Sequence, residues 1–319
     1  MGDVIHALPV VSDLMRAMPL ARIDWIVEEA FAELPALHPQ VAAVVPVAVR
    51  RWRRTPLARA TRAEIRAVKQ RLRDAGYERA LDLQGLIKSA WVARFTRAPV
   101  AGFSRACARE PLAAWFYRDR YDVDLRLHAI ERLRSLAAQA FGYAVTGAPV
   151  FGLRVPDEAV PGLPQEPFAV LLHATSRADK QWPQANWAEL IGRLANAGLR
   201  VALPWGSQAE RQRAEQLAAG HPAASVLPRL SLRQCAAAIG RAHCVVGVDT
   251  GLTHLASALD APTVALFAAT PAWRFGSYWS ERAVSLGSDG HWPDADEVLR
   301  TALRVADLRR SAAAVTHGA

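Results

Sequence analysis

Residues 168–267 alternate between short apolar runs and segments in which apolar residues recur at helical spacing. The apolar runs, each of strand length, are Phe168–Leu172, 199–203, 225–227, Cys244–Val248 and 263–267. The helical segments follow from Asn186, Gln208, Ser231 and Leu252, the first with Trp187, Leu190, Ile191 and Leu194 on one face. Asn186 is the expected N-cap of that helix because Glu189 follows three residues later. Strict strand–helix alternation predicts an α/β fold with a parallel, doubly wound sheet.

The first half of the chain has the same rhythm with more interruptions. It predicts strands at 23–27, Val41–Val47 and 80–83, and helices at 61–75 and 125–141. A stretch with four prolines, 154–167, is the expected linker. We therefore predict two α/β domains, 1–153 and 168–319, that face each other across a cleft. The last helix of the chain is expected to pack back on the first domain.

The chain starts in an unusual way for such a fold. Met1-Gly2-Asp3 runs directly into a helical pattern, whereas a doubly wound domain begins with a strand. Two explanations remain open, a truncated chain and a start codon assigned too late, and we favour the second. In either case the first N-terminal strand is missing from the 319-residue chain, and we expect weak activity or low stability that upstream codons would restore.

Charge distinguishes the two halves more clearly than hydrophobicity does. Residues 1–150 contain 23 Lys and Arg against 15 Asp and Glu, while residues 151–319 contain 16 against 15. The basic half suggests an anionic partner, although a generally Arg-rich sequence is the alternative explanation. No apolar run has the length of a membrane span, no signal peptide is visible, and the three cysteines form no CxxC. These features predict a cytoplasmic location with reduced thiols.

Asp249-Thr250-Gly251 is the first candidate for chemistry, because it follows a buried strand and opens a helix. Ligands of open α/β sheets bind at such strand ends, and the free N–H groups of the helix favour phosphate. Asp249 would repel phosphate, so we expect it to accept hydrogen bonds from sugar hydroxyls. His254 lies one turn further on the same face. The alternative is a plain helix cap at Asp249 with a surface histidine at His254.

Two further strand ends carry ligand-type residues. The loop after 168–172 offers the hydroxyls of Thr175 and Ser176 for phosphate oxygens and Lys180 for a leaving pyrophosphate. Glu210 lies near the start of the helical segment from Gln208, which follows the strand 199–203. It fits the two hydroxyls of a ribose, or is simply a favourable first-turn carboxylate.

In the basic half, 50–54 is the densest cluster, with Arg50, Arg51 and Arg53, and Lys88 and Arg109 add to it. Any one of these residues fits a solvated surface, but together they resemble a floor for phosphates. GxGxxG, Walker A and GxSxG motifs do not occur. Asp122-Val123-Asp124 is a DxD, the motif that holds the cation of some glycosyltransferases, but its position among basic and aromatic residues makes a metal site there a weak hypothesis.

Taken together, several motifs resemble glycosyltransferase family 9 in order and composition. They are 1–6 (MGDVIH), 84–88 (QGLIK), 173–180 (HATSRADK), 204–206 (PWG) and 249–254 (DTGLTH). The segments 25–29 and 50–53 favour its lipopolysaccharide heptosyltransferase I group over the heptosyltransferase II group. The resemblance runs nearly end to end. It implies a GT-B fold of two facing Rossmann-like domains, the first for the acceptor and the second for the donor.

The resemblance also implies an activity and a role for each matched residue. The family's reaction is an inverting transfer of L-glycero-D-manno-heptose from ADP-heptose to a Kdo sugar of Kdo2-lipid A. Asp3 matches the catalytic base, and Leu230 lies where adenine is held. Thr175, Ser176 and Lys180 match phosphate contacts, Glu210 matches the ribose contact, and Asp249, Thr250, Gly251, Leu252 and His254 match the heptose and phosphate site. Arg50, Arg51, Arg53, Lys88 and Arg109 match the acceptor side.

Further expectations follow from this resemblance. No metal and no cofactor are required, since ADP-heptose is a substrate. The basic half suits peripheral contact with the cytoplasmic face of the inner membrane, with Trp52 at the interface, and we expect a monomer. Three other hypotheses stay open: another family-9 transferase such as heptosyltransferase II, a non-catalytic nucleotide-sugar-binding or anionic-lipid-binding protein, and a nucleic-acid-binding module. No recognised reader motif supports the last, and we expect no nucleic-acid partner.

Overall fold

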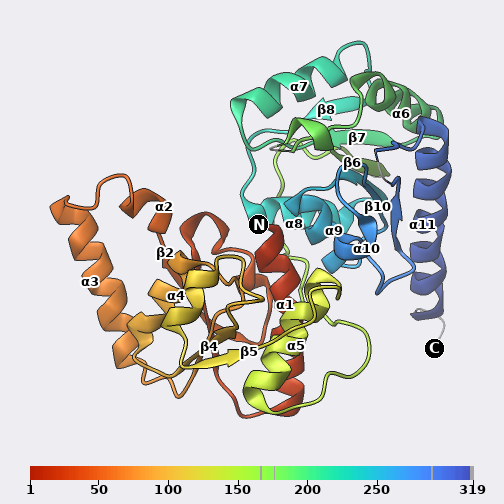
Figure 1. The fold of residues 1–319 in the computed structure, drawn as a ribbon. Coiled ribbons are helices and arrows are strands. Elements are labelled where there is room, and N and C mark those ends of the chain that lie inside the picture. Colours follow the sequence, from red (N-terminus) through yellow and green to blue (C-terminus); the bar gives the residue numbers. More distant parts are fainter. Residues whose placement is uncertain (166, 176, 289, 317–319) are drawn as a thin grey trace. The chain divides into compact units, whose positions relative to one another are not determined.

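The computed structural model describes residues 1–316 except Glu166, Ser176 and Asp289, with side chains described as far as Leu308. The chain divides into two compact units (Figure 1). The C-terminal unit consists of Leu153–Ala319 together with Met1–Ile5, and the N-terminal unit consists of His6–Gly152. The first turn of helix α1 (Gly2–Ala17) therefore belongs to the C-terminal unit.

The C-terminal unit contains a parallel six-stranded sheet in the order β11-β10-β9-β6-β7-β8. Its strands are β6 (Phe168–Leu172), β7 (Arg200–Leu203), β8 (Ala224–Val226), β9 (Cys244–Val248), β10 (Thr263–Leu266) and β11 (Ala283–Leu286). The chain builds outward from β6 to β8, then returns and builds outward from β9 to β11. The order reverses between the neighbours β6 and β9, which is the switch point where open α/β sheets bind ligands.

Helices lie between and after these strands, and side-chain caps set the starts of α7 and α8. They are α6 (Gln184–Asn196), α7 (Gln208–Ala218), α8 (Leu232–Arg241), α9 (Gly251–Ala258), α10 (Ala272–Phe275) and α11 (Ala295–Thr316). Ser207 and Ser231 form capping boxes with Glu210 and Gln234. The prediction of Asn186 as the N-cap of α6 is wrong. Pro183 is the N-cap, because a proline disfavours helical geometry in the residue before it, and Asn186 falls inside the first turn.

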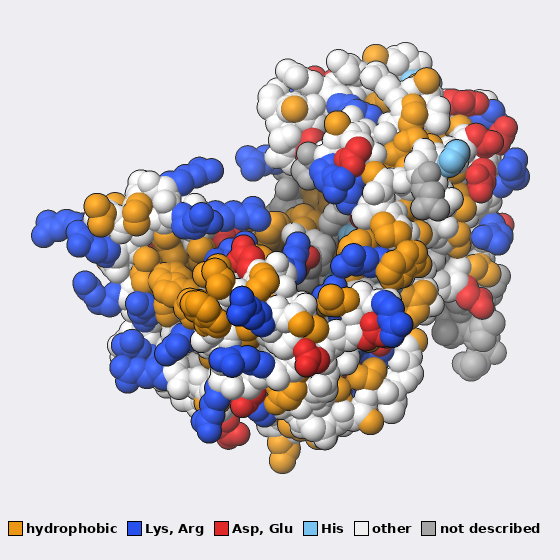
Figure 2. Space-filling view, viewed as in Figure 1, with side chains coloured by type: hydrophobic (Ala, Val, Ile, Leu, Met, Phe, Trp, Pro, Cys, Tyr) orange, Lys and Arg blue, Asp and Glu red, His pale blue; other side chains and the backbone are white. Residues whose placement is uncertain are grey.

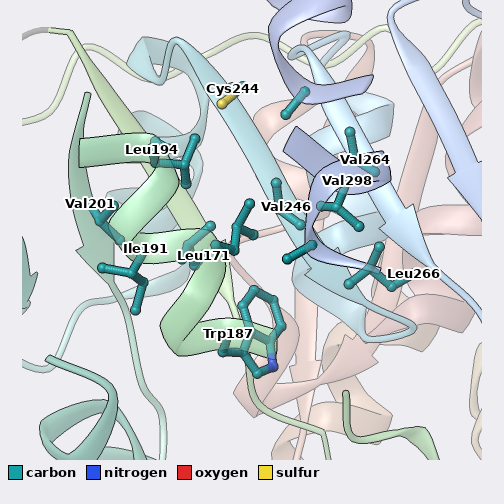
Figure 3. Packing of buried hydrophobic residues seen from close by; sticks show 14 of the residues in the cluster. Leu171, Trp187, Ile191, Leu194, Val201, Cys244, Val246, Val264, Leu266 and Val298 are labelled. Atoms are coloured by element: carbon teal, nitrogen blue, oxygen red, sulfur yellow. The ribbon is translucent and has the colours of Figure 1, made fainter. Parts of the chain in front are cut away.

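The core of the C-terminal unit lies between its sheet and the helices α6 and α11. Figure 3 shows Trp187, Ile191 and Leu194 of α6 directed toward strand residues such as Leu171 and Val246. Val298, Ala302 and Val305 give α11 one buried face, and α11 packs on α6 and on β9, β10 and β11. The last helix, expected on the first domain, thus covers the sheet of its own unit.

The N-terminal unit contains two parallel sheets, β1-β2 and β3-β4-β5. Its strands are β1 (Ile23–Glu28), β2 (Val41–Val47), β3 (Ala80–Leu81), β4 (Val100–Phe103) and β5 (Asp119–Tyr121). Its helices are α2 (Val49–Trp52), α3 (Arg59–Asp74), α4 (Ile87–Ala93) and α5 (Ala129–Phe141), with a short 3-10 helix η4 (Pro111–Phe116). Strands β4 and β5 and helix α4 had not been predicted.

Two predicted boundaries in this unit are wrong for local reasons. The strand expected at 80–83 ends at Leu81, because the Asp82 side chain accepts a hydrogen bond from the Gln84 backbone N–H at 2.8 Å and turns the chain. The helix expected from residue 125 begins at Ala129, because the His128 side chain caps it by accepting from the Ile130 N–H at 3.2 Å.

A buried ion pair joins α1 to α5 inside the N-terminal unit. Arg134 donates from Nε and Nη2 to the two carboxylate oxygens of Asp13, at 2.7 and 3.1 Å. The side chains are 1% and 3% exposed. Arg134 also donates to Glu131 and to the backbone carbonyl groups of Thr146 and Gly147, so the buried guanidinium is well supplied with acceptors.

The proline-rich segment after Gly152 is held along α8. Val155 fills the space beside Gly240, where a β-carbon would lie 2.4 Å from Val155 Cγ1. Glu158 accepts from Arg233 at 3.0 Å through its side chain and from Arg241 at 2.7 Å through its backbone carbonyl. Among the described residues, no helix combines the length and apolar character that crossing a bilayer requires.

Candidate functional site

Asp249 directly follows β9 and lies at the switch point of the six-stranded sheet. Its Oδ2 accepts hydrogen bonds from Lys180 Nζ and Thr270 Oγ1, both at 2.5 Å. Its Oδ1 lies 3.1 Å from Nε2 of His254 on α9. Lys180 comes from the loop after β6 and Thr270 from the loop after β10, so three neighbouring strand ends meet at this one carboxylate.

The Asp249 carboxylate is charged despite its burial. It is only 8% exposed, and burial alone would raise its pKa. The hydrogen bonds from His254, Lys180 and Thr270 outweigh burial and hold the pKa of Asp249 well below its ordinary value. This fixed anion orients the Lys180 ammonium group. The Lys180 side chain is 16% exposed, so it remains partly accessible to solvent.

The alternative of a plain cap with a surface histidine is wrong. The N-cap of α9 is Thr250, without a side-chain capping bond, and His254 is only 8% exposed. Thr250, Gly251 and Leu252 are half-buried in the first turn of that helix. Asp249 thus contacts other side chains of the site and does not serve as the helix cap.

The first residues of the chain lie against the N-terminus of α9. A β-carbon at Gly251 would lie 2.6 Å from Cβ of Met1, and one at Gly2 would lie 3.5 Å from Cδ2 of His254. The absence of a side chain at Gly251 therefore admits Met1. Asp3, exposed in the first turn of α1, belongs to the same compact unit as Asp249.

The loop after β6 supplies the other expected phosphate contacts. Thr175 is half-buried, and its Oγ1 lies 3.5 Å from the Arg177 N–H. Ser176 lies outside the described residues. Before this loop, His173 is fully buried, and burial, together with the nearby charge of Arg213, lowers its pKa to about 4. His173 is therefore neutral near pH 7 and belongs to the support of the loop.

Glu210 and Leu230 follow β7 and β8. Glu210 Oε2 accepts from the backbone N–H groups of Gly206 and Ser207 at 2.7 and 3.1 Å. Glu210 is therefore a carboxylate that stabilises the first turn of its helix, as one of the two interpretations of the sequence held. Contact with a ribose stays a prediction. Leu230 is half-buried immediately before Ser231, the N-cap of α8.

The arginine cluster 50–54 lies in the N-terminal unit and is partly engaged there. Arg51 bridges Glu29 and Glu64 at 3.1 and 3.0 Å. Arg50 has its guanidinium 5.7 Å from the centre of the Phe31 ring, and Arg53 is exposed. Arg51 therefore ties the cluster to its own unit through these two ion pairs.

The expectation that Trp52 lies at a membrane interface is wrong. Trp52 is 4% exposed, in a cluster with residues of β2 and α3, and its indole N–H donates to Glu64 Oε2 at 2.8 Å. An apolar ring with a satisfied donor gains more from this core than from solvent contact.

Lys88 and Arg109 lie near a loop held by a buried carboxylate. Asp82 accepts from Tyr117 Oη at 2.7 Å and from Ser89 Oγ at 2.8 Å, and burial raises its pKa. Gly85 has φ +67° and approaches the Arg109 backbone, because a β-carbon there would lie 3.3 Å from the Arg109 nitrogen. Lys88 is half-buried on α4, and Arg109 is exposed. Asp82 was not among the residues predicted for the site, although a carboxylate after a short strand is a usable signal.

The DxD motif is engaged in local bonds. Asp122 accepts from Ser104 Oγ, and Asp124 pairs with Arg126 at 2.9 Å. Within the part of the chain that the structure describes, no group of three or more His, Cys, Asp and Glu side chains is arranged to hold a metal ion. The two carboxylates of the motif therefore hold neighbouring segments of their own unit together.

Thr270 is the site residue that sequence reasoning missed. It follows β10 by a few residues, and a polar side chain after a buried strand was the same signal that identified Asp249 and Thr175. The short, unpatterned loop after β10 gave no motif to support it.

Comparisons with known proteins agree with this geometry. A family model described as glycosyltransferase family 9 (heptosyltransferase) matches residues 65–302. The chain belongs to glycosyltransferase family 9. This family-9 chain is 48% identical over 291 residues to lipopolysaccharide heptosyltransferase 1 of Pseudomonas aeruginosa, covering 91% of this chain and 81% of that protein.

Solved structures extend the comparison to the fold. The structure titled E. coli heptosyltransferase WaaC with ADP has a TM-score of 0.86 and 37% identity, covering 96% of this chain and 97% of that one. A second, with ADP-2-deoxy-2-fluoro heptose, has a TM-score of 0.80 and 36% identity, covering 95% of each chain. The predicted family, the GT-B fold and the glycosyltransferase activity are confirmed.

Proposed function

We propose that this chain transfers L-glycero-D-manno-heptose from ADP-heptose to a Kdo residue of Kdo2-lipid A, in the synthesis of the lipopolysaccharide inner core. The observation that carries the proposal is the Lys180–Asp249–His254 constellation at the switch point of a family-9 sheet. Support for the sugar nucleotide comes from the names of the relatives: a lipopolysaccharide heptosyltransferase and a heptosyltransferase with an ADP-heptose analogue.

In this proposal the C-terminal unit binds the donor. Lys180 and the free N–H groups at the start of α9 meet the diphosphate, with Thr175 and Ser176 as further donors. Asp249 and His254 face hydroxyl groups of the heptose, while Thr250, Gly251 and Leu252 line the sugar. Glu210 takes the ribose, using the carboxylate that also caps α7, and Leu230 covers the adenine.

Asp3 acts as the base. It takes the proton of the acceptor hydroxyl as that oxygen attacks the anomeric carbon, and the bond to the ADP oxygen breaks on the opposite face. ADP leaves with its negative charge met by Lys180. The displacement needs no cofactor, since both reacting groups come from the substrates.

The acceptor carries phosphates and Kdo carboxylates, which suit the basic N-terminal unit. Arg50, Arg53, Lys88 and Arg109 are proposed to contact these anions, with Arg51 holding the cluster in place. The enzyme works as a monomer in the cytoplasm, on the cytoplasmic face of the inner membrane where its lipid-anchored acceptor lies.

The test is the mass of the product formed from ADP-heptose with each of two acceptors. Kdo2-lipid A is expected to gain one heptose residue, and an acceptor that already carries the first heptose is expected to remain unchanged. Gain only on the second acceptor would indicate a heptosyltransferase II activity. Gain on neither, with ADP-heptose still bound, would indicate a non-catalytic binding protein and overturn the proposal.

A further inference from the structure

Helix α3 carries a stripe of basic residues along one face. Its members, spaced alternately by three and four residues, are Arg59, Arg62, Arg66, Lys69 and Arg73. This spacing keeps all five on the same side of an α-helix. Lys69 is half-buried and the other four are exposed. We call this set the basic stripe.

The basic stripe has no counter-charge in its own unit. Within the described residues of the chain, none of the five is in an ion pair. The acidic residue Glu64 lies on the opposite side of α3, where it pairs with Arg51, and Asp74 accepts a hydrogen bond from Gln70. Like charges three and four residues apart destabilise a helix, so the stripe costs stability unless an external anion meets it.

An apolar surface adjoins the basic stripe. Its members lie on α4 and η4: Trp115 is 68% exposed, Leu112 46% and Ile87 37%, and Trp91 is half-buried one turn after Ile87. The two elements meet where the Ile87 N–H donates to Glu110 Oε2 at 2.7 Å. We call this set the apolar band.

Lys69 joins the two sets. Its ammonium group lies 5.9 Å from the centre of the Trp91 ring and 4.7 Å from that of Phe95. Figure 2 shows hydrophobic side chains gathered over α4, with Lys and Arg side chains along the neighbouring α3. The surface is thus apolar in one part and cationic beside it.

We propose that the basic stripe and the apolar band together dock this unit on an anionic lipid bilayer. Tryptophan and leucine next to lysine and arginine suit the headgroup boundary, where rings enter the interface and cations meet lipid phosphates. A nucleic acid would use the charge but would leave Leu112 and Ile87 exposed to water. The proposal deepens the proposed function, since it assigns the membrane contact to residues outside the acceptor-binding set.

Co-sedimentation with vesicles tests the proposal. The full chain is mixed with vesicles of phosphatidylcholine alone or of phosphatidylcholine with phosphatidylglycerol. One variant carries Arg62→Gln, Arg66→Gln and Arg73→Gln. A matched control carries Arg200→Gln, Arg300→Gln and Arg304→Gln, three exposed arginines of the C-terminal unit. A second pair compares Trp115→Ser with Trp273→Ser, because Trp273 is similarly exposed at 63%.

The wild-type chain is expected to bind only the anionic vesicles, less at high salt. The stripe variant lacks three cations and should lose about 100-fold in partition coefficient, since each cation near the surface contributes about fivefold. Trp115→Ser should lose about tenfold through its apolar area. Both controls should bind as the wild type does.

Unchanged vesicle binding by the stripe variant would overturn the proposal, as would equal binding to both vesicle types. Loss of binding to a DNA duplex with unchanged vesicle binding would identify a nucleic-acid surface instead and equally overturn it. Heptose transfer to the acceptor sugar freed of its acyl chains should be unchanged in the stripe variant. If the wild type shows no transfer but the vesicle results hold, the proposed function fails and the docking surface stands.

Discussion

Lys180 Nζ lies 2.5 Å from Oδ2 of Asp249, although 69 residues separate them in the sequence. The pair joins the loops after β6 and β9, the two neighbouring strands at which the sheet order reverses. Asp249 thus fixes the position of a cation that would otherwise move freely on a flexible side chain. A pre-positioned cation stabilises a leaving diphosphate without reorganising during the reaction.

Asp249→Asn should reduce kcat by at least about 100-fold, because the amide keeps the shape but loses the charge that orients Lys180 and His254. Steady-state kinetics with ADP-heptose measures this. Asp260→Asn is the control for loss of a carboxylate charge elsewhere, since Asp260 is exposed and bonds Ser280 and Arg282 outside the site. Equal kinetics of the two variants would show that the Asp249 charge has no role.

Thr270→Val should lower kcat about tenfold, because it removes one hydrogen bond to a charged acceptor and leaves Asp249 Oδ2 with a single donor. Thr270→Ser retains the hydroxyl and should keep most of the activity. A positioning role predicts that the loss appears in kcat with little change in KM. A Thr270→Ser variant as impaired as Thr270→Val would contradict this account, because the hydroxyl alone would then not sustain the activity.

His173 should make the chain less stable in mild acid. Its pKa is about 4 in the folded chain because it is buried, and about 6.5 when unfolded. The unfolded state therefore binds more protons between these values, and stability falls by about 1.4 kcal/mol for each pH unit below 6.5 until about pH 4. Urea unfolding at pH 7 and pH 5, followed by tryptophan fluorescence, measures the slope. His173→Asn should flatten it, and an identical slope would contradict this account.

Arg134→Met should destabilise the N-terminal unit by about 3–5 kcal/mol, because it leaves the carboxylate of Asp13 buried without its cation. Arg126→Met breaks an exposed pair with Asp124 and should leave the stability nearly unchanged, because solvent screens that pair. Denaturant unfolding curves of the two variants give both values. A loss for Arg134→Met as small as that of the control would mean that the buried pair contributes no stability.

Local sequence predicted well which side chains follow the central strands of the sheet, and predicted the groups that support them poorly. β6 and β9 were predicted to the residue because both are short, fully buried runs with distinct ends. Lys180, Asp249 and His254 were found from their place after those strands. The hydrogen bond from Thr270 and the packing of Met1 on Gly251 were not, because each depends on segments that meet only in the folded chain. The position of Trp52 was predicted wrongly because its sequence neighbours are arginines, whereas the apolar residues that it packs against come from β2 and α3.

The central claim is that this chain transfers heptose with Asp3 as the base. The most direct measurement is the mass of the acceptor after incubation of Kdo2-lipid A and ADP-heptose with the wild-type chain and with Asp3→Ala. We predict one added heptose with the wild type and none with Asp3→Ala, while both bind ADP equally by calorimetry. Product formation by Asp3→Ala at the wild-type rate would contradict the account.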